Sequence, residues 1–217
     1  MFKSAIVALA GLGLSAAVSA QTLTEGEDYT RLETPVTTQA ADDQIEVTEV
    51  FWFGCPHCYR LQPAVTEWYS TLPDDVVVVQ QPATMGGAWN VHAGAFYAAQ
   101  ALGIEDELHA DFFDALHEQG RELTDTDTLA AFFSNYGVSQ DAARKALDSF
   151  GVKAQVNKAH ARLRNMRLKG VPALVVDGRY VVTPQSAGSL ANMPKVAEAL
   201  IQRTRKEQGG GSDSDDA

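Results

Sequence analysis

The two cysteines of this 217-residue chain, Cys55 and Cys58, lie three positions apart in the segment FWFGCPHCYR at residues 51–60. A disulfide between them closes a very small ring, which removes little entropy from the unfolded chain and makes a weak structural bridge. The same spacing suits a reactive pair, in which one thiolate attacks and the second thiol resolves the mixed disulfide. A zinc site needs four ligands, and the chain offers no further cysteine and no closely spaced histidine pair. The spacing favours redox chemistry over a passive bridge or a metal site, and we expect no cofactor.

A strand-to-helix junction is predicted to hold this pair. Polar and apolar residues alternate at the start of the segment QIEVTEVFWF, residues 44–53, and its end is continuously apolar. This pattern is typical of a buried strand, and Gly54 follows it. Further along, apolar residues recur at spacings of four, three and four, as on one face of a helix. These are Leu61, Val65, Trp68 and Leu72. Cys55 is therefore expected at the first turn of that helix.

The start of a helix is a favourable place for a cysteine thiolate. Unpaired backbone N–H groups and the positive end of the helix dipole would face the Cys55 sulfur and lower the pKa of its thiol. Pro56 fits an early helical position because no backbone N–H is needed there. His57 could add a positive charge or a hydrogen-bond donor, although an exposed histidine without a role is the simpler alternative.

The first residues read as a secretory signal peptide. Lys3 precedes an apolar run from about Ala5 to Ala17, and the small residues Val18-Ser19-Ala20 follow, so cleavage is expected after Ala20. The run is too short for a spanning helix, which needs about 20 apolar residues. The sequence therefore predicts an exported protein, located in a compartment that permits disulfides.

Removal of residues 1–20 leaves 197 residues and takes the formal net charge from −11 to −12, because this segment holds one lysine and no acid. The length suits one domain, or one domain with an insertion. The strong negative charge argues against nucleic acid and anionic membranes as partners. The glycine-rich acidic end, residues 206–217, is predicted to be disordered.

The remaining patterns predict further strands and helices. DVVVVQ at residues 75–80 reads as a buried strand, and residues 88 to about 150 show only helical patterns. One of them ends at Gly137; another has Ser139 as its N-cap, Phe150 on its apolar face and Gly151 as its stop. A helix is expected over about 152–168 and a last one over 189–204. Between them, PALVV and RYVVT flank Asp177-Gly178, a strong hairpin signal.

The C-P-H-C motif after an aromatic strand, in an exported chain, resembles the DsbA family of thiol oxidoreductases. Three other segments are similar to that family: EDYTRLETPV at 27–36, MGG at 85–87 and KGVPALVVDGRYVV at 169–182. The resemblance implies an α/β protein, a thioredoxin fold with an inserted helical domain. The predicted order of elements agrees with this topology. We expect a thioredoxin-like domain over 21–87 and 152–205, interrupted by a helical insertion over 88–151.

The resemblance also implies roles for residues near the cysteines. It implies a cis peptide bond between Val171 and Pro172 in a loop that faces the cysteines, where the Val171 backbone would pair with a substrate chain. Pro172 could otherwise simply open a strand, where a missing N–H is tolerated. We further expected Phe53, Tyr59 and this loop to form an exposed apolar surface for unfolded chains.

Glu49 lies in the predicted strand, six positions before Cys55. By alternation it could face water. In the resembled family, an acid at this place lies beneath the cysteines and passes protons, and burial favours such a role near neutral pH. The family often has a lysine nearby on the following strand, whereas this chain offers Gln80, so a glutamate–lysine mechanism is in doubt.

These observations predict a monomeric thiol:disulfide oxidoreductase that donates the Cys55–Cys58 disulfide to reduced, unfolded polypeptides in the periplasm. By resemblance, its reoxidation partner would be a quinone-linked membrane protein similar to DsbB. Two alternatives stay open. One is a disulfide reductase or isomerase of the same compartment, and the other is a peptide-binding chaperone whose cysteines are incidental.

Overall fold

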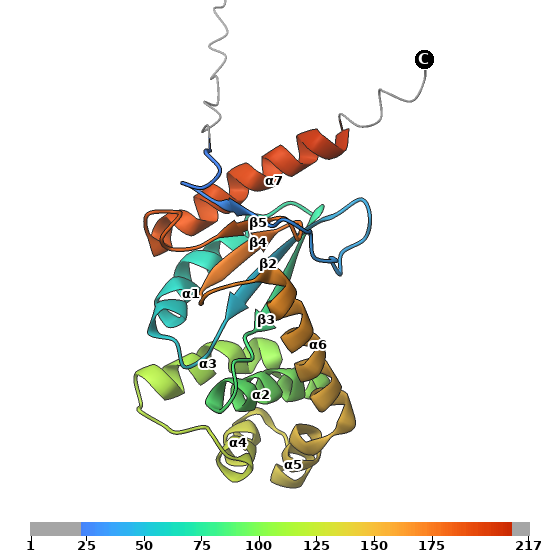
Figure 1. The fold of residues 1–217 in the computed structure, drawn as a ribbon. Helices are drawn as coiled ribbons and strands as arrows, with labels where there is room; N and C mark the ends of the chain where they lie inside the picture. The colour runs from blue at the N-terminus through green and yellow to red at the C-terminus, as the bar shows by residue number, and fades with distance from the viewer. Residues whose placement is uncertain (1–22, 210–217) are drawn as a thin grey trace, which may run out of the picture.

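The computed structural model describes residues 23–209, which form a five-stranded mixed sheet with helices on both faces (Figure 1). The strand order is β1-β5-β4-β2-β3; β2 and β3 run parallel, and the other neighbours pair antiparallel. The strands are β1 Thr30–Arg31, β2 Ile45–Phe51, β3 Val76–Pro82, β4 Ala173–Val176 and β5 Tyr180–Val182. The predicted strands and the hairpin are confirmed, whereas the two-residue strand β1 was not anticipated. The predicted signal peptide lies outside the described residues.

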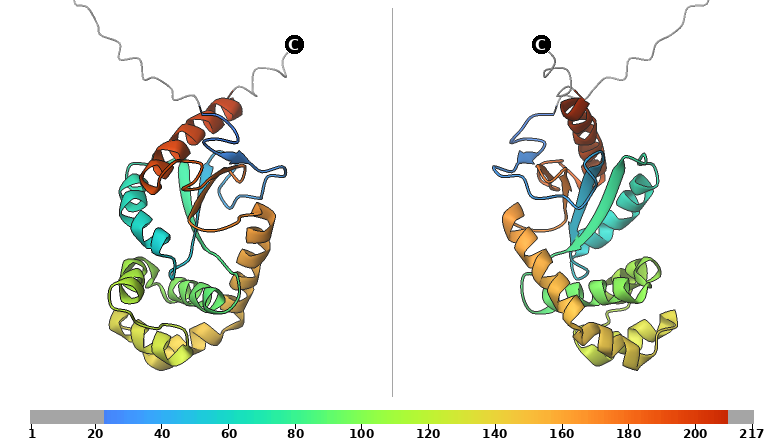
Figure 2. Two further views of the ribbon diagram at one scale, coloured as in Figure 1. Left: turned by 60° about the vertical axis from the view of Figure 1, so that its left-hand side comes forward. Right: turned by 90° about the vertical axis from the view of Figure 1, so that its right-hand side faces the viewer.

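Helices α1 (Pro56–Tyr69) and α7 (Met193–Gly209) cover one face of the sheet, and α6 (Phe150–Met166) covers the other (Figure 2). Each face has its own core. Leu61 of α1 and Leu200 of α7 pack with Val47 of β2, and Leu163 of α6 packs with Val50 of β2 on the opposite side. Because every residue of β2 is buried, this strand contributes side chains to the cores on both faces of the sheet.

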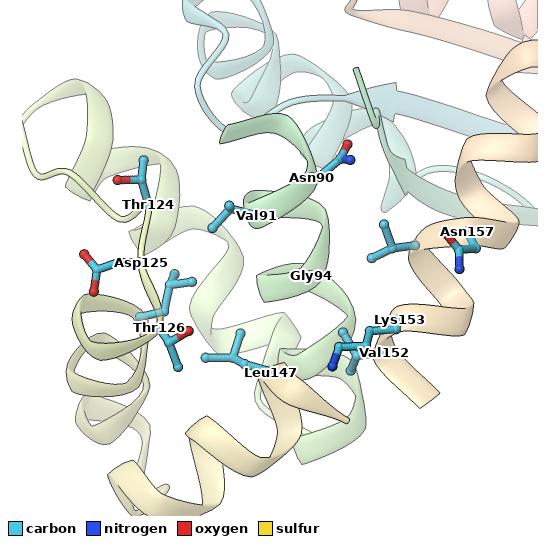
Figure 3. Close-up of a pocket in the computed structure, with 12 residues that line it drawn as sticks. Asn90, Val91, Gly94, Thr124, Asp125, Thr126, Leu147, Val152, Lys153 and Asn157 are labelled. Atoms are coloured by element: carbon cyan, nitrogen blue, oxygen red, sulfur yellow. The ribbon is translucent and has the colours of Figure 1, made fainter. Parts of the chain in front are cut away.

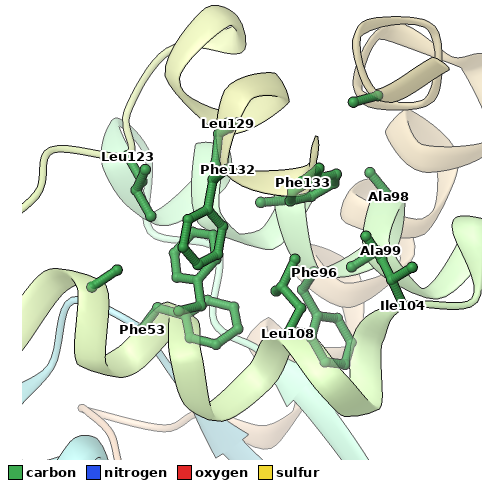
Figure 4. Close-up of a cluster of buried hydrophobic side chains, with 14 of the residues drawn as sticks. Phe53, Phe96, Ala98, Ala99, Ile104, Leu108, Leu123, Leu129, Phe132 and Phe133 are labelled. Atoms are coloured by element: carbon green, nitrogen blue, oxygen red, sulfur yellow. The ribbon is translucent and has the colours of Figure 1, made fainter. Parts of the chain in front are cut away.

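A second layer of helices lies beyond the ends of β2 and β3 (Figure 1). It contains α2 Ala88–Leu102, α3 Glu105–His117, α4 Thr126–Phe133 and α5 Gln140–Asp148, with a short 3₁₀ turn at Ser134–Tyr136. Its core is rich in phenylalanine, and Phe53 from the end of β2 reaches into it (Figure 4). The expected cap at Ser139 and the left-handed stop at Gly137 are confirmed. The fold is a thioredoxin fold with a helical insertion.

The predicted ends of two helices were wrong. Ser149 ends α5 and caps α6 with its side chain, so α6 begins at Phe150 and Gly151 lies inside it. The Phe150 side chain is 87% exposed, not on the apolar face as expected, because the chain turns one residue earlier. At the other end, α7 continues to Gly209, so residues 206–209 are helical; the rest of the predicted disordered tail lies outside the described residues.

Candidate active site

Cys55 is the N-cap of α1, and Pro56 occupies the first helical position, as predicted. The backbone of Cys55 is extended, with φ −91° and ψ 116°, and the Cys55 N–H donates to the Trp52 carbonyl at 2.9 Å. The sulfur of Cys55 lies 3.7 Å from the carbonyl oxygen of Val171, 116 positions further along the chain. The start of α1 and the loop before β4 therefore meet at this sulfur.

The surroundings of Cys55 stabilise its thiolate and lower the pKa of its thiol from 9 to about 6. The largest cause is a hydrogen bond from the Cys58 thiol, and partial burial opposes it. The backbone N–H groups of Cys58 and His57 and the charge of His57 add to the lowering. His57 is exposed, yet it contributes in the way that the sequence suggested.

Cys58 lies one turn further along α1 and is fully buried among the helical-layer core. Burial, first of all, raises the pKa of the Cys58 thiol strongly, and the hydrogen bond to Cys55, its charge and that of Glu49 act in the same direction. Both cysteines are free thiols in this structure. The pair thus combines one sulfur poised as a thiolate with a second that holds its proton.

The Val171–Pro172 peptide bond is cis, as the resemblance implied. Pro172 is buried, whereas Val171 is partly exposed beside Cys55. A groove of about 620 Å³, here named the cis-Pro groove, runs along this loop. It is lined by residues 30–33, His57, residues 166–172, Val181 and residues 183–185.

Glu49 is fully buried, so the alternative that it faces water was wrong. Its carboxylate accepts hydrogen bonds from Gln62 Nε2 at 2.8 Å, Tyr69 Oη at 2.9 Å and Gln80 Nε2 at 3.0 Å. Gln80 pairs directly with Glu49 across the parallel strands β2 and β3. Gln62 and Tyr69 were missed by the sequence analysis, although their spacing of seven places both on one face of α1. Three uncharged donors, here called the Glu49 cage, hold this acid.

Phe53 and Tyr59 do not form an exposed apolar surface. Only 1% of Phe53 is exposed, because the helical layer covers it, so its predicted contact with substrates was wrong. Tyr59 is partly exposed; its ring stacks on His117 and its hydroxyl donates to Asp114 at 2.9 Å. His117 also contacts the Phe53 carbonyl oxygen through Nε2 at 2.7 Å. These contacts tie α1 and the cysteine segment to α3.

The position of the Trp52 side chain explains why a glycine, Gly54, precedes the cysteine motif. Its indole stacks on Trp89 with ring centroids 4.0 Å apart. A Cβ on Gly54 would lie 2.4 Å from the Trp52 ring, so any larger residue would displace the indole. The sequence showed only that Gly54 ends the strand; its close approach to Trp52 depends on the fold.

A separate cavity of about 470 Å³ lies within the helical layer. Figure 3 shows Asn90 and Val91 of α2 on one side of it and Lys153 and Asn157 of α6 on another. None of the residues around the cysteines lines it. Across residues 23–209 no group of three or more acidic, histidine or cysteine side chains is arranged to hold a metal ion. Over the same range, no helix has the length and apolarity to cross a membrane.

A thioredoxin fold, a cysteine pair at a helix start and a facing cis-proline loop together define a thiol:disulfide oxidoreductase. Residues 83–200 match the family model of the DSBA-like thioredoxin domain. A thiol:disulfide interchange protein DsbA of Azotobacter vinelandii is 40% identical over 183 residues, 84% of this chain and 85% of that protein. The chain therefore belongs to the DsbA-like thioredoxin family, and it is a thiol:disulfide interchange protein.

Solved structures agree with this assignment. A variant of Pseudomonas aeruginosa DsbA matches with a TM-score of 0.82 and 36% identity, over 85% of this chain and 99% of that chain. DsbA of Xylella fastidiosa matches with a TM-score of 0.80 and 31% identity, over 84% and 97% of the two chains. The similarity covers both the sheet and the helical layer, since nearly all of each solved chain is matched.

Proposed function

We propose that the protein donates the Cys55–Cys58 disulfide to reduced, unfolded polypeptides in the periplasm. A substrate thiolate attacks the Cys55 sulfur, the bond to Cys58 breaks, and Cys58 leaves with the electron pair and takes up a proton. A second substrate thiolate then attacks the substrate sulfur of the mixed disulfide, and Cys55 leaves as a thiolate. The substrate loses two electrons and the enzyme gains them.

The opposite pKa shifts of the two thiols carry this proposal. Because its thiolate is stabilised, Cys55 is a good leaving group in the second step, and the reduced enzyme is favoured over its disulfide. In the mixed disulfide Cys58 is held as a neutral thiol, so it is a poor nucleophile for attacking Cys55 and releasing the substrate unoxidised. A helix-start thiolate of this kind favours giving a disulfide away over keeping it.

Glu49 is the proposed proton donor and acceptor for Cys58. It is buried, and it is close enough to Cys58 for its charge to raise the pKa of that thiol. The Glu49 cage holds the carboxylate with three neutral donors, and within residues 23–209 no lysine or arginine forms a salt bridge with it. The proposed mechanism therefore uses Glu49 without a lysine partner.

The cis-Pro groove is the proposed binding site for the substrate chain. The Val171 backbone lies beside the Cys55 sulfur, where it could pair with an extended polypeptide. Reoxidation would come from a quinone-linked membrane protein similar to DsbB, which would react with the same partly exposed Cys55 sulfur. We further propose a monomer with the domain division 21–87, 88–151 and 152–205 after removal of residues 1–20.

The redox equilibrium of Cys55–Cys58 with glutathione tests this function, read by tryptophan fluorescence because Trp52 adjoins the motif. A reduction potential well above about −180 mV would support disulfide donation, and one near about −270 mV would make the protein a reductant. A protein with both cysteines replaced by serine should lose oxidation of a reduced test protein. If that variant instead keeps the full effect on folding yields, the chaperone alternative is correct.

A further inference from the structure

The cis-Pro groove has a charge opposite to that of the whole chain. Its charged side chains, besides His57, are Arg31, Arg167, Lys169 and Glu33, three cations and one acid, whereas the chain carries a formal net charge of −11. Arg167 pairs with Glu33 at 2.7 Å, and both side chains are largely exposed. Within the described part of the chain, Arg31 and Lys169 take part in no salt bridge, and both side chains are exposed. The Arg31 guanidinium lies over the Tyr180 ring, 5.7 Å from its centroid, and this contact leaves its charge uncompensated.

The opposite side of α1 is acidic. A second groove of about 1,020 Å³, here named the α1–α3 groove, lies between α1 and α3. Its charged side chains, besides His109, are Arg60, Glu67, Glu105, Asp106 and Asp114, one cation and four acids. His57 lines the first groove and Tyr59 the second, and two helical positions turn the side chain by roughly 200°. A chain bound at Cys55 therefore meets positive potential on one side and negative potential on the other.

We infer that the cis-Pro groove selects polypeptide segments with aspartate or glutamate next to the reacting cysteine. This inference rests on the proposed function and names the substrate class for it. Exposed cations beside a reactive group raise the association rate of acidic ligands, and the net negative charge elsewhere on the protein repels the same ligands from other places. The acidic α1–α3 groove disfavours the opposite orientation, in which the acids lie beside α3.

The test measures reduction of the oxidised full-length mature protein by three synthetic dithiol peptides. The peptides differ only in the residues that flank the first cysteine: two aspartates, two serines or two lysines. Tryptophan fluorescence follows the opening of the Cys55–Cys58 bond. Because flanking acids also change the reactivity of the peptide thiol, each rate is divided by the rate of that peptide with a small uncharged disulfide.

We expect the corrected rate for the aspartate peptide to exceed that for the serine peptide by about tenfold at low salt. The ratio should fall towards one at high salt, since screening acts over about 10 Å at 0.1 M. Equal corrected rates for the aspartate and serine peptides at low salt, or a higher corrected rate for the lysine peptide, would overturn the inference. A serine peptide that is not oxidised at all would instead overturn the proposed function, so the two failures are distinguishable.

Three variants locate the effect. Lys169→Gln should lower the aspartate-to-serine ratio, and Glu33→Gln should raise it, because one removes a cation and the other an acid from the groove. Lys145→Gln is the matched control, since it removes an exposed lysine on α5, at the far end of the helical layer (Figure 1). If Lys145→Gln lowers the ratio as much as Lys169→Gln, the preference comes from net charge and the inference is wrong.

Discussion

The two cysteines lie one helical turn apart, in two regions that shift the pKa of a thiol in opposite directions. The mouth of the site consists of the start of α1 and the Val171–Pro172 loop, where the hydrogen bond from the Cys58 thiol, then the backbone N–H groups of Cys58 and His57, favour a thiolate at Cys55. The floor consists of the helical-layer core and the Glu49 cage, where burial holds the proton on Cys58. The same residue type becomes a nucleophile or a proton carrier according to whether hydrogen-bond donors or desolvation dominate.

The largest expected effect comes from replacing each cysteine separately with serine, which compares the reactivity of a thiol in the mouth with that of a thiol in the floor. Both variants lose disulfide donation. In Cys58→Ser the serine hydroxyl can replace the Cys58 thiol as hydrogen-bond donor, so the Cys55 thiolate stays stabilised, whereas Cys55→Ser keeps only a buried neutral thiol. We expect Cys58→Ser to form a stable mixed disulfide with oxidised glutathione at neutral pH, and Cys55→Ser to form almost none. Mass spectrometry of the folded proteins measures both. Equal labelling of the two variants would mean that mouth and floor do not differ in reactivity.

The second prediction concerns pH. The pKa of Cys55 lies near 6 in the folded reduced protein and near 9 when unfolded, so it is a depressed pKa. Its stabilisation of the reduced form is therefore complete above pH 9 and is lost as pH falls towards 6. Cys58, with a raised pKa, begins to oppose this only above pH 9, where the unfolded chain ionises.

Denaturant unfolding of the reduced and oxidised forms between pH 5 and pH 9 measures the effect. The difference in unfolding free energy should shift towards the reduced form as pH rises from 6. Thiolate absorbance of reduced protein should titrate with a midpoint near pH 6 and disappear in Cys55→Ser. A midpoint near 9 would show that the mouth does not stabilise a thiolate.

The variant Glu49→Gln tests whether the floor supplies a proton when the Cys55–Cys58 bond opens. The amide keeps the shape of the carboxylate but cannot carry a proton, so the opening of the Cys55–Cys58 bond should slow by on the order of tenfold at neutral pH. Stopped-flow fluorescence with a reduced peptide measures the rate. Glu27→Gln, at an exposed position that lines neither groove, is the control and should leave the rate unchanged. The role of Glu49 would be disproved by a Glu49→Gln rate equal to that of the control across the pH range.

Much of the mouth, but little of the floor, could be predicted from the sequence. The start of α1 depends on local signals, namely an apolar strand, Gly54 and a helix-start proline, whereas the cis bond before Pro172 was implied by the family resemblance. The Asp177-Gly178 turn, at the other end of β4, was also a local signal, and both of its residues have positive φ as expected. The floor depends on contacts between distant segments. Phe53 is buried because α3 lies over it, and the cage forms only where α1 crosses β2 and β3. No local pattern encodes such a crossing. Phe150 was misplaced for a different, local reason, because Ser149 caps a new helix that starts there.

The smallest expected effect belongs to the Glu49 cage. Tyr69→Phe removes one of the two donors to Glu49 Oε2 and leaves Gln80 as the other, so we expect a loss of about 1 kcal/mol in unfolding free energy. Tyr136→Phe is the matched control, because it removes a tyrosine hydrogen bond to Asp111 within the helical layer. Of the two variants, only Tyr69→Phe should also slow the opening of the disulfide by a reduced peptide, since Tyr69 contacts Glu49. If both variants lose similar stability and neither rate changes, Tyr69 supports the fold without positioning Glu49, and the floor acts through burial alone.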